Sequence, residues 1–249
     1  MRHEPIQALH AANRGAAPAV IAPRLVIAGA TGALGNEMLR RLVGLQQFGT
    51  TVVLAREAIT AGLRGVSTQL VPSDAPADWP PLAADTGIVL FDPPRLFYDR
   101  ERALWTPRPE QLPDTAAWMR RSGVTTLAVV LPHAQGRLPE ALKRGLAGLD
   151  EHAVAALGFE RLLFIRSAEK PVPAAATGWL QGVAQWMLSV TRFMVPASEQ
   201  PVRAAKVAEL VAVALQLAPA GIHVAAPELV WQASQGALRD VARQWLRAP

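Results

Sequence analysis

The chain has 249 residues, of which 51% are hydrophobic and 18% are charged. This length predicts one large α/β domain, or one and a half smaller ones, with ample apolar material for a core. The sequence contains no cysteine, which excludes disulfides, thiolate metal sites and a cysteine nucleophile. Its formal net charge of +5 comes from scattered Arg residues and gives no strong sign of a nucleic-acid-binding face.

Two segments of the sequence bear on whether the chain carries a secretory signal or a membrane-spanning helix. Residues 1–23 lack the apolar core of roughly 7–15 residues that a secretory signal needs, and we interpret them as a flexible N-terminal arm. The most apolar long window, 207–226, contains Glu209, Pro219 and His223, which disfavour a membrane-spanning helix. We therefore predict a cytoplasmic protein without a membrane span.

Apolar runs of strand length alternate with segments of helical periodicity over residues 24–170. The predicted strands cover residues 25–28, 51–55, 66–71, 87–91, 124–131 and 160–165, and the predicted helices cover 33–47, 114–121 and 139–157. Continuously apolar strands that alternate with amphipathic helices are typical of a parallel sheet covered on both faces. The predicted fold class is therefore α/β, with a doubly wound parallel sheet.

Residues 171–249 have a different pattern, which we interpret as a small C-terminal helical lobe packed on the sheet. Helices are predicted at 178–194 and 201–217, followed by a short strand at 221–225 and a terminal helix that ends near residue 247. The first of these helices is rich in Trp and Met. It could line a substrate pocket, a homodimer interface or a contact with a membrane surface, although ordinary core packing explains it more simply.

The stretch LVIAGATGALG, residues 25–35, places three glycines directly after the first strand and at the start of the first helix. Glycine permits a tight turn and lets the backbone approach a pyrophosphate closely, while the N–H groups at the helix start face the anion. In this context the spacing predicts a dinucleotide site, with a turn that binds no ligand as the alternative. The residues expected to hold the cofactor are Gly29, Thr31, Gly32, Ala33, Leu34 and Gly35.

The end of the second strand bears on the choice between the two nicotinamide dinucleotides. An acidic residue there hydrogen-bonds the ribose of NAD, whereas an Arg accommodates the extra phosphate of NADP. Arg56 comes first after the strand and favours NADP, but Glu57 follows it and leaves NAD open. Asp74, after the third strand, is a candidate contact of the adenine amino group.

These stretches, together with VVLAR, VTTLAVVL, ALGFERLLFIR, PVRAAKVAELVAVAL and GIHV, resemble the atypical, extended short-chain dehydrogenase/reductase superfamily. Within it, the chain is most similar to the NAD(P)H-binding group that includes the human Tat-interacting oxidoreductase-like proteins and their bacterial relatives. The likeness covers residues 24 to about 230. It implies a Rossmann-type domain with a small C-terminal substrate lobe.

Catalytic members of that superfamily use a Tyr, a Lys four residues later, and a Ser at the end of the preceding strand. The single tyrosine of this chain, Tyr98, lies in the Pro- and charge-rich segment 93–113, with Arg102 four residues beyond it. The positions that the resemblance assigns to Tyr and Lys fall near Lys143 and Ala147. Because positioned acid–base groups contribute about 10²–10⁴-fold, we expect hydride transfer by the standard route to be feeble.

Two other residues are candidates to replace the lost groups. His133 follows a central strand, on the side where open α/β sheets bind ligands, and a histidine titrates near neutrality. Asp92 follows the neighbouring strand and could orient the His133 imidazole. A carboxylate at this position would also repel a pyrophosphate. No spacing of His, Asp or Glu in the sequence predicts a metal site.

Three functions remain. The favoured one is an NADP-binding protein that lacks standard catalysis and serves as a sensor, scaffold or assembly factor. The second is an active oxidoreductase or isomerase that acts on a small molecule through His133, Asp92 or Tyr98. The third is a regulator that binds a protein partner or nucleic acid.

Overall fold

The computed structural model describes residues 22–59, 65–95, 98–131, 150–166 and 204–247. Three predicted features lie outside these ranges: the N-terminal arm except for its last two residues, the helix at 178–194, and the candidate catalytic residue His133. The domain boundary predicted near residue 170 also lies outside them.

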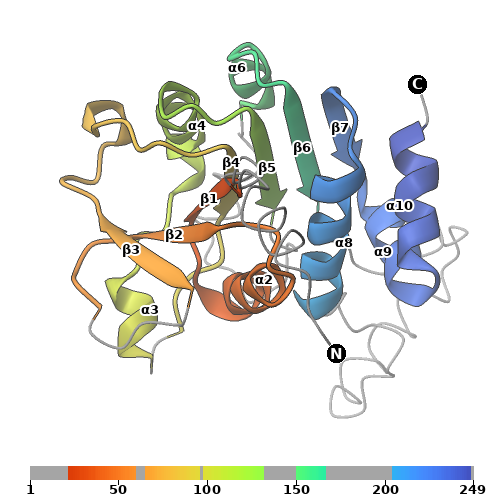
Figure 1. The fold of residues 1–249 in the computed structure, drawn as a ribbon, viewed down its shortest axis with the longest axis horizontal. Helices are drawn as coiled ribbons and strands as arrows, with labels where there is room; N and C mark the ends of the chain where they lie inside the picture. Colours follow the sequence, from red (N-terminus) through yellow and green to blue (C-terminus); the bar gives the residue numbers. More distant parts are fainter. Residues whose placement is uncertain (1–21, 60–64, 96–97, 132–149, 167–203, 248–249) are drawn as a thin grey trace, which may run out of the picture.

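Within the described residues, seven strands form one sheet in the order β3-β2-β1-β4-β5-β6-β7 (Figure 1). Every neighbouring pair is parallel, and the chain winds outward in opposite directions from the β1–β4 pair. The order of the first six strands is that of a Rossmann-type sheet, so the predicted fold class is confirmed. The strands are β1 (Arg24–Ala28), β2 (Thr50–Ala55), β3 (Val66–Leu70), β4 (Thr86–Leu90), β5 (Thr126–Leu131), β6 (Arg161–Arg166) and β7 (Gly221–Ala225).

Helices cover both faces of this sheet. Figure 1 shows α4 and α6 on one side and α2 and α8 on the other, with α9 and α10 beyond β7. Each face has its own cluster of buried apolar side chains. The helices are α2 (Gly32–Gly44), α3 (Asp99–Ala103), α4 (Leu112–Arg121), α6 (Glu151–Ala155), α8 (Ala204–Leu217), α9 (Pro227–Gln235) and α10 (Leu238–Arg247).

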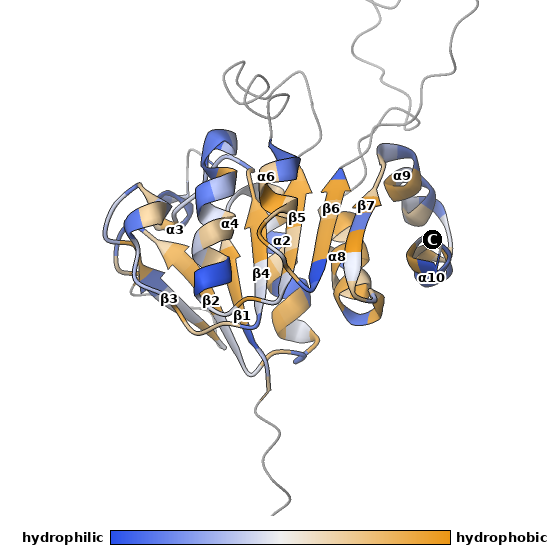
Figure 2. Ribbon diagram, turned by 90° about the horizontal axis from the view of Figure 1, so that it is seen from above, coloured by the Kyte–Doolittle hydropathy of each residue, from blue (hydrophilic) through white to orange (hydrophobic). Residues whose placement is uncertain are grey.

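The strands lie close to where the sequence predicts them, because the central strands are buried on both faces and therefore consist of apolar residues. Figure 2 shows hydrophobic residues along most of β1, β4, β5 and β6, as expected for parallel strands between two helical layers. The sequence did not indicate that β7 belongs to the same sheet, where it pairs with β6. The prediction of a single terminal helix is wrong, because α9 ends at Gln235 and α10 begins at Leu238, after Gly236. None of the described helices is both long and apolar enough to cross a membrane.

Candidate functional site

The glycine turn between β1 and α2 has the tight geometry that the sequence predicts. Gly29 and Gly32 adopt φ angles of +79° and +67°, which residues with side chains rarely tolerate. A Cβ on Gly29 would lie 2.0 Å from the carbonyl oxygen of Leu90, in β4. A Cβ on Gly35 would lie 2.4 Å from the carbonyl carbon of Ala30, within the turn. All three glycines are therefore required by this local structure.

A carboxylate of the chain itself lies at the start of α2. The Gly32 N–H donates to Glu101 Oε2 at 2.9 Å, and Glu101 belongs to α3. Glu101 is only 4% exposed, and its oxygens also accept from Asn36 Nδ2 at 2.7 Å and from the N–H and Nε of Arg95 at 2.9 and 2.7 Å. The N-terminus of a helix favours anions, and here Glu101 supplies the anion.

The surroundings of Glu101 favour its ionised form. Burial alone would raise the pKa of this carboxyl, but the hydrogen bonds from Arg95, Gly32 and Asn36 outweigh burial and hold the pKa below its usual range. The Arg95 guanidinium also forms an ion pair with it, at 2.5 Å. Glu101 is therefore bonded to donors in the way that a bound anion would be.

A second carboxylate, Asp92, lies beside the same turn, just after β4. Its Oδ2 accepts from the Leu34 N–H at 3.3 Å, and its carbonyl oxygen accepts from Thr31 Oγ1 at 2.5 Å. Burial raises the pKa of Asp92; the Leu34 hydrogen bond opposes this rise, and the charge of Glu101 adds to it. The catalytic pairing of Asp92 with His133 stays a prediction, since His133 lies outside the described residues.

Residues 98–106, here called the crossing segment, pass over the carboxyl ends of β1 and β2. This segment comprises Tyr98, α3 and the three residues after α3. Three backbone hydrogen bonds and one antiparallel bridge attach it to the strand ends. They are Gly29 N–H to Trp105 O (3.1 Å), Trp105 N–H to Leu54 O (2.9 Å), Arg56 N–H to Ala103 O (2.7 Å), and the bridge between Ala55 and Leu104. The Ala103 carbonyl oxygen also accepts a longer bond from the Glu57 N–H, at 3.4 Å, just beyond β2.

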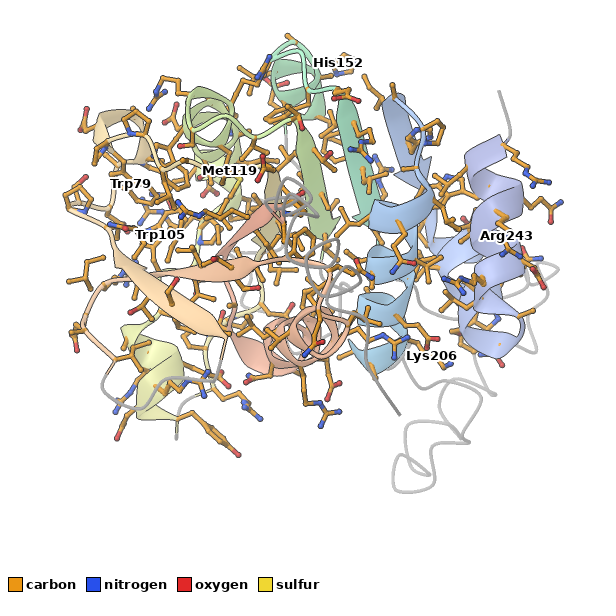
Figure 3. The ribbon with its side chains drawn as sticks, viewed as in Figure 1. Trp79, Trp105, Met119, His152, Lys206 and Arg243 are labelled. Carbon is orange, nitrogen blue, oxygen red and sulfur yellow. The ribbon has the colours of Figure 1, made fainter. Side chains whose placement is uncertain are left out.

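The side chain of Trp105 links the crossing segment to the loop after β3. Trp105 is fully buried, and its ring meets Trp79 edge-on at a centroid distance of 4.7 Å (Figure 3). Its Nε1 donates to Asp74 Oδ1 at 2.8 Å, and Arg56 and Arg108 donate to the same carboxylate at 3.0 and 3.2 Å. Burial alone would raise the pKa of Asp74, but the bonds from Trp105 and the two Arg residues hold it below its usual value. Arg56 and Asp74, both predicted to contact the adenosine half of a cofactor, thus contact each other.

In the described arrangement these residues do not fit a dinucleotide. The backbone turn has the right geometry, but the Gly32 N–H is bonded to Glu101, and a pyrophosphate would face this carboxylate and Asp92. The main chain of the crossing segment covers the strand ends over which the adenosine half lies in Rossmann-type sites. Of the other predicted contacts, Thr31 and Leu34 are buried and Ala33 is exposed.

Sequence reasoning missed the residues that make this arrangement. Glu101, Trp105 and Arg95 come from a stretch that looked like an irregular, Pro- and charge-rich connection. Its charged residues have no periodicity that separates one buried carboxylate from its solvated neighbours. The run Leu104-Trp105 between charged residues was the one available signal of a buried position.

The described residues do not bring together a standard acid–base set. Tyr98 is 51% exposed, and the Arg95 guanidinium lies 3.8 Å from its ring centroid. Lys143 and Ala147, near which the resemblance places the family's Tyr and Lys respectively, lie outside the described residues. Over the described part of the chain, no group of three or more His, Asp or Glu is placed to hold a metal ion.

No family model matches the sequence, and no curated protein matches it. Similar solved structures include the Citrobacter sp. triphenylmethane reductase complexed with NADP(H), at 17% identity over 77% of this chain and 65% of the reductase, with a TM-score of 0.46. The Bordetella bronchiseptica enzyme WbmH in complex with NAD+ is 12% identical over 85% of this chain and 80% of its own, with a TM-score of 0.46. The enzyme WbmG of the same organism, in complex with NAD, is 13% identical over 94% and 81%, with a TM-score of 0.45.

All three are enzymes solved with a nicotinamide dinucleotide, and the chain spans just under two thirds of the length of the reductase. The fold class rests on the strand order of the sheet and not on these likenesses. The narrower likeness to the Tat-interacting oxidoreductase-like group stays a prediction.

Proposed function

We propose that the chain is an NAD(P)-binding protein of the short-chain dehydrogenase/reductase type that works as a sensor, scaffold or assembly factor and not as a standard reductase. The glycine turn is the observation that carries this proposal. Its three glycines are held where a Cβ would clash or a positive φ is needed, at the β1–β4 switch point where such sheets bind ligands.

The proposal favours NADP over NAD because of Arg56. Its guanidinium is about half exposed and bonded to Asp74, so it can turn toward a 2′-phosphate at small cost. Glu57, the next residue, is exposed and keeps NAD as the alternative. A bidentate contact between Arg56 and the 2′-phosphate would favour NADP over NAD, which has only a hydroxyl at that position.

The proposed lack of standard catalysis is supported by the absence from the sequence of a tyrosine followed by a lysine four residues later. The chain has one tyrosine, and Tyr98 precedes a five-residue helix near the glycine turn, without a lysine four positions later. Without a positioned proton donor, a bound nicotinamide would exchange hydride with a carbonyl about 10²–10⁴-fold more slowly than in an intact site. Binding without turnover is the role that this set of residues supports.

A titration of the purified protein with NADPH and NADH, followed by tryptophan fluorescence, tests the proposal. We expect NADPH to bind about tenfold more tightly than NADH, a difference of about 1.4 kcal/mol. Arg56→Ala should remove this preference, while Arg40→Ala, a solvent-exposed Arg on α2, should leave it unchanged. Failure of both dinucleotides to bind would overturn the proposal.

An active, atypical oxidoreductase is the second candidate function, and the raised pKa of Asp92 favours it. A perturbed carboxyl at the ligand side of a sheet is a common property of acid–base groups. A screen of carbonyl substrates with NADPH would test it. If a turnover is found and Asp92→Asn leaves its rate intact, Asp92 is not the acid or base.

A further inference from the structure

The crossing segment and a dinucleotide need the same backbone groups, and we infer that this segment is an internal competitor that keeps the cofactor crevice closed until a dinucleotide displaces it. This inference rests on the proposed function, because it concerns the regulation of that same site. Three sets of contacts support it: those at the pyrophosphate position, those at the adenosine position and those that attach the segment to the sheet.

The pyrophosphate position is taken by Glu101. In a glycine turn of this kind, the N–H groups at the helix start are the donors for the pyrophosphate. Here the Gly32 N–H, 2.9 Å from Glu101 Oε2, is one of those donors. The Asn36 amide and the N–H and Nε of Arg95 complete the set of donors around this buried carboxylate. The anion at the start of α2 is thus a side chain of the chain itself.

The adenosine position is taken by the main chain from Ala103 to Trp105. The backbone of this stretch bonds to Gly29 at the end of β1 and to Leu54 and Arg56 at the end of β2. In a Rossmann-type site, the residue at the end of the second strand instead contacts the adenosine ribose. The buried indole of Trp105 also holds Asp74, the predicted adenine contact.

Release of the segment requires the buried Leu104 and Trp105 to leave the apolar clusters on the two faces of the sheet, in addition to breaking its backbone hydrogen bonds. Asp99 and Arg102 in α3 are exposed, and the apolar anchors of the segment are Leu104 and Trp105. A ligand that binds only the open form has an apparent affinity reduced by the fraction of molecules that are open. Any change that weakens the closed form should therefore tighten dinucleotide binding.

Glu101→Gln tests the contacts at the pyrophosphate position. The substitution removes the ion pair with Arg95 and the negative charge that would face a pyrophosphate, so we expect NADPH to bind about tenfold more tightly than to the unaltered protein. Asp99→Asn is the matched control, since it removes the same charge from the same short helix at a carboxylate whose side chain is 89% exposed. It should change NADPH affinity less than about twofold.

A disulfide tests the displacement itself. Ala55 and Leu104 face each other across the antiparallel bridge, between the two flanking hydrogen bonds, where Cα atoms lie about 4.5 Å apart. This separation suits a disulfide, and the chain has no other cysteine to compete with the pair. In the Ala55→Cys/Leu104→Cys variant, the oxidised form should bind NADPH at least tenfold more weakly than the same sample after reduction.

The outcomes separate the inference from the proposed function. If Glu101→Gln binds NADPH no more tightly than the unaltered protein, or if the oxidised and reduced forms bind it equally, the crossing segment does not compete and the inference is overturned, while the proposed function stands. If neither the unaltered protein, Glu101→Gln nor the reduced variant binds NADPH or NADH, the proposed function fails and the inference falls with it.

Discussion

The two sides of the sheet's switch point are held together by different forces. On the β1–β2 side, the crossing segment is attached by backbone hydrogen bonds and by the buried or half-buried carboxylates Glu101 and Asp74. On the β5–β6 side, α8 packs mainly through apolar residues, and Val207, Leu210 and Val211 are all buried. Its partly exposed edge adds an ion pair from Glu209 to Arg41 of α2, at 3.5 Å. The strength of the apolar contacts depends little on salt and pH, whereas an anionic ligand can replace a carboxylate in the charged contacts.

The largest effect is expected at the glycine turn, on which both sides depend. Gly29→Ala places a Cβ 2.0 Å from the Leu90 carbonyl oxygen in a backbone of positive φ, so it should cost at least about 3–5 kcal/mol of unfolding free energy. Gly44→Ala, at the end of α2 with no atom within 4 Å of the added Cβ, should be neutral or stabilising by up to about 1 kcal/mol. Urea unfolding measures both, and equal costs would contradict the role given to the turn.

The apolar side should respond next, and without dependence on salt. Leu210→Ala empties part of the contact between α8 and the sheet and should lower the free energy of unfolding by about 2–5 kcal/mol. We expect the same loss at 0.05 and 1 M salt, measured by urea unfolding. A loss that changes strongly with salt would show that the Leu210 contact is coupled to the ion pair between Glu209 of α8 and Arg41 of α2.

The charged side should respond less, and in a pH-dependent way. The pKa of Glu101 is lowered in the folded protein, so its contribution to stability is present above its unfolded pKa of about 4.3 and is lost as the pH falls through the folded pKa. Glu101→Gln should therefore cost about 1–3 kcal/mol at pH 7 and much less at pH 3. A cost that is equal at the two pH values would argue against an ionised, bonded Glu101.

The smallest effect should have the opposite sign. The pKa of Asp92 is raised, so its favourable contribution is full below its unfolded pKa of about 3.9 and is lost as the pH rises through the folded pKa. Asp92→Asn should keep the Leu34 hydrogen bond and stabilise the protein at pH 7 by up to about 1 kcal/mol. Thermal unfolding at pH 7 and pH 4 checks this, and destabilisation at pH 7 would contradict it.

The sequence predicted the sheet well and the site incompletely, for reasons that follow from the same comparison. Strands such as β1, β4 and β5 are buried on both faces, and an apolar run is a direct consequence of that burial. The glycine turn could be found because its backbone geometry excludes other residues. The carboxylate that bonds to the turn could not be found in this way, because Glu101 is one of several carboxylates in its segment. Its burial depends on how the crossing segment folds back over the strand ends, which no local sequence pattern encodes.

The central claim is that a dinucleotide replaces the crossing segment at the glycine turn, and amide hydrogen exchange with and without saturating NADPH tests it most directly. We predict that NADPH slows exchange in residues 29–36 and speeds it in residues 98–106, since the N–H of Gly32 gains a phosphate while that of Trp105 loses its bond to Leu54. Slower exchange in both segments, or no change in either, would contradict the claim.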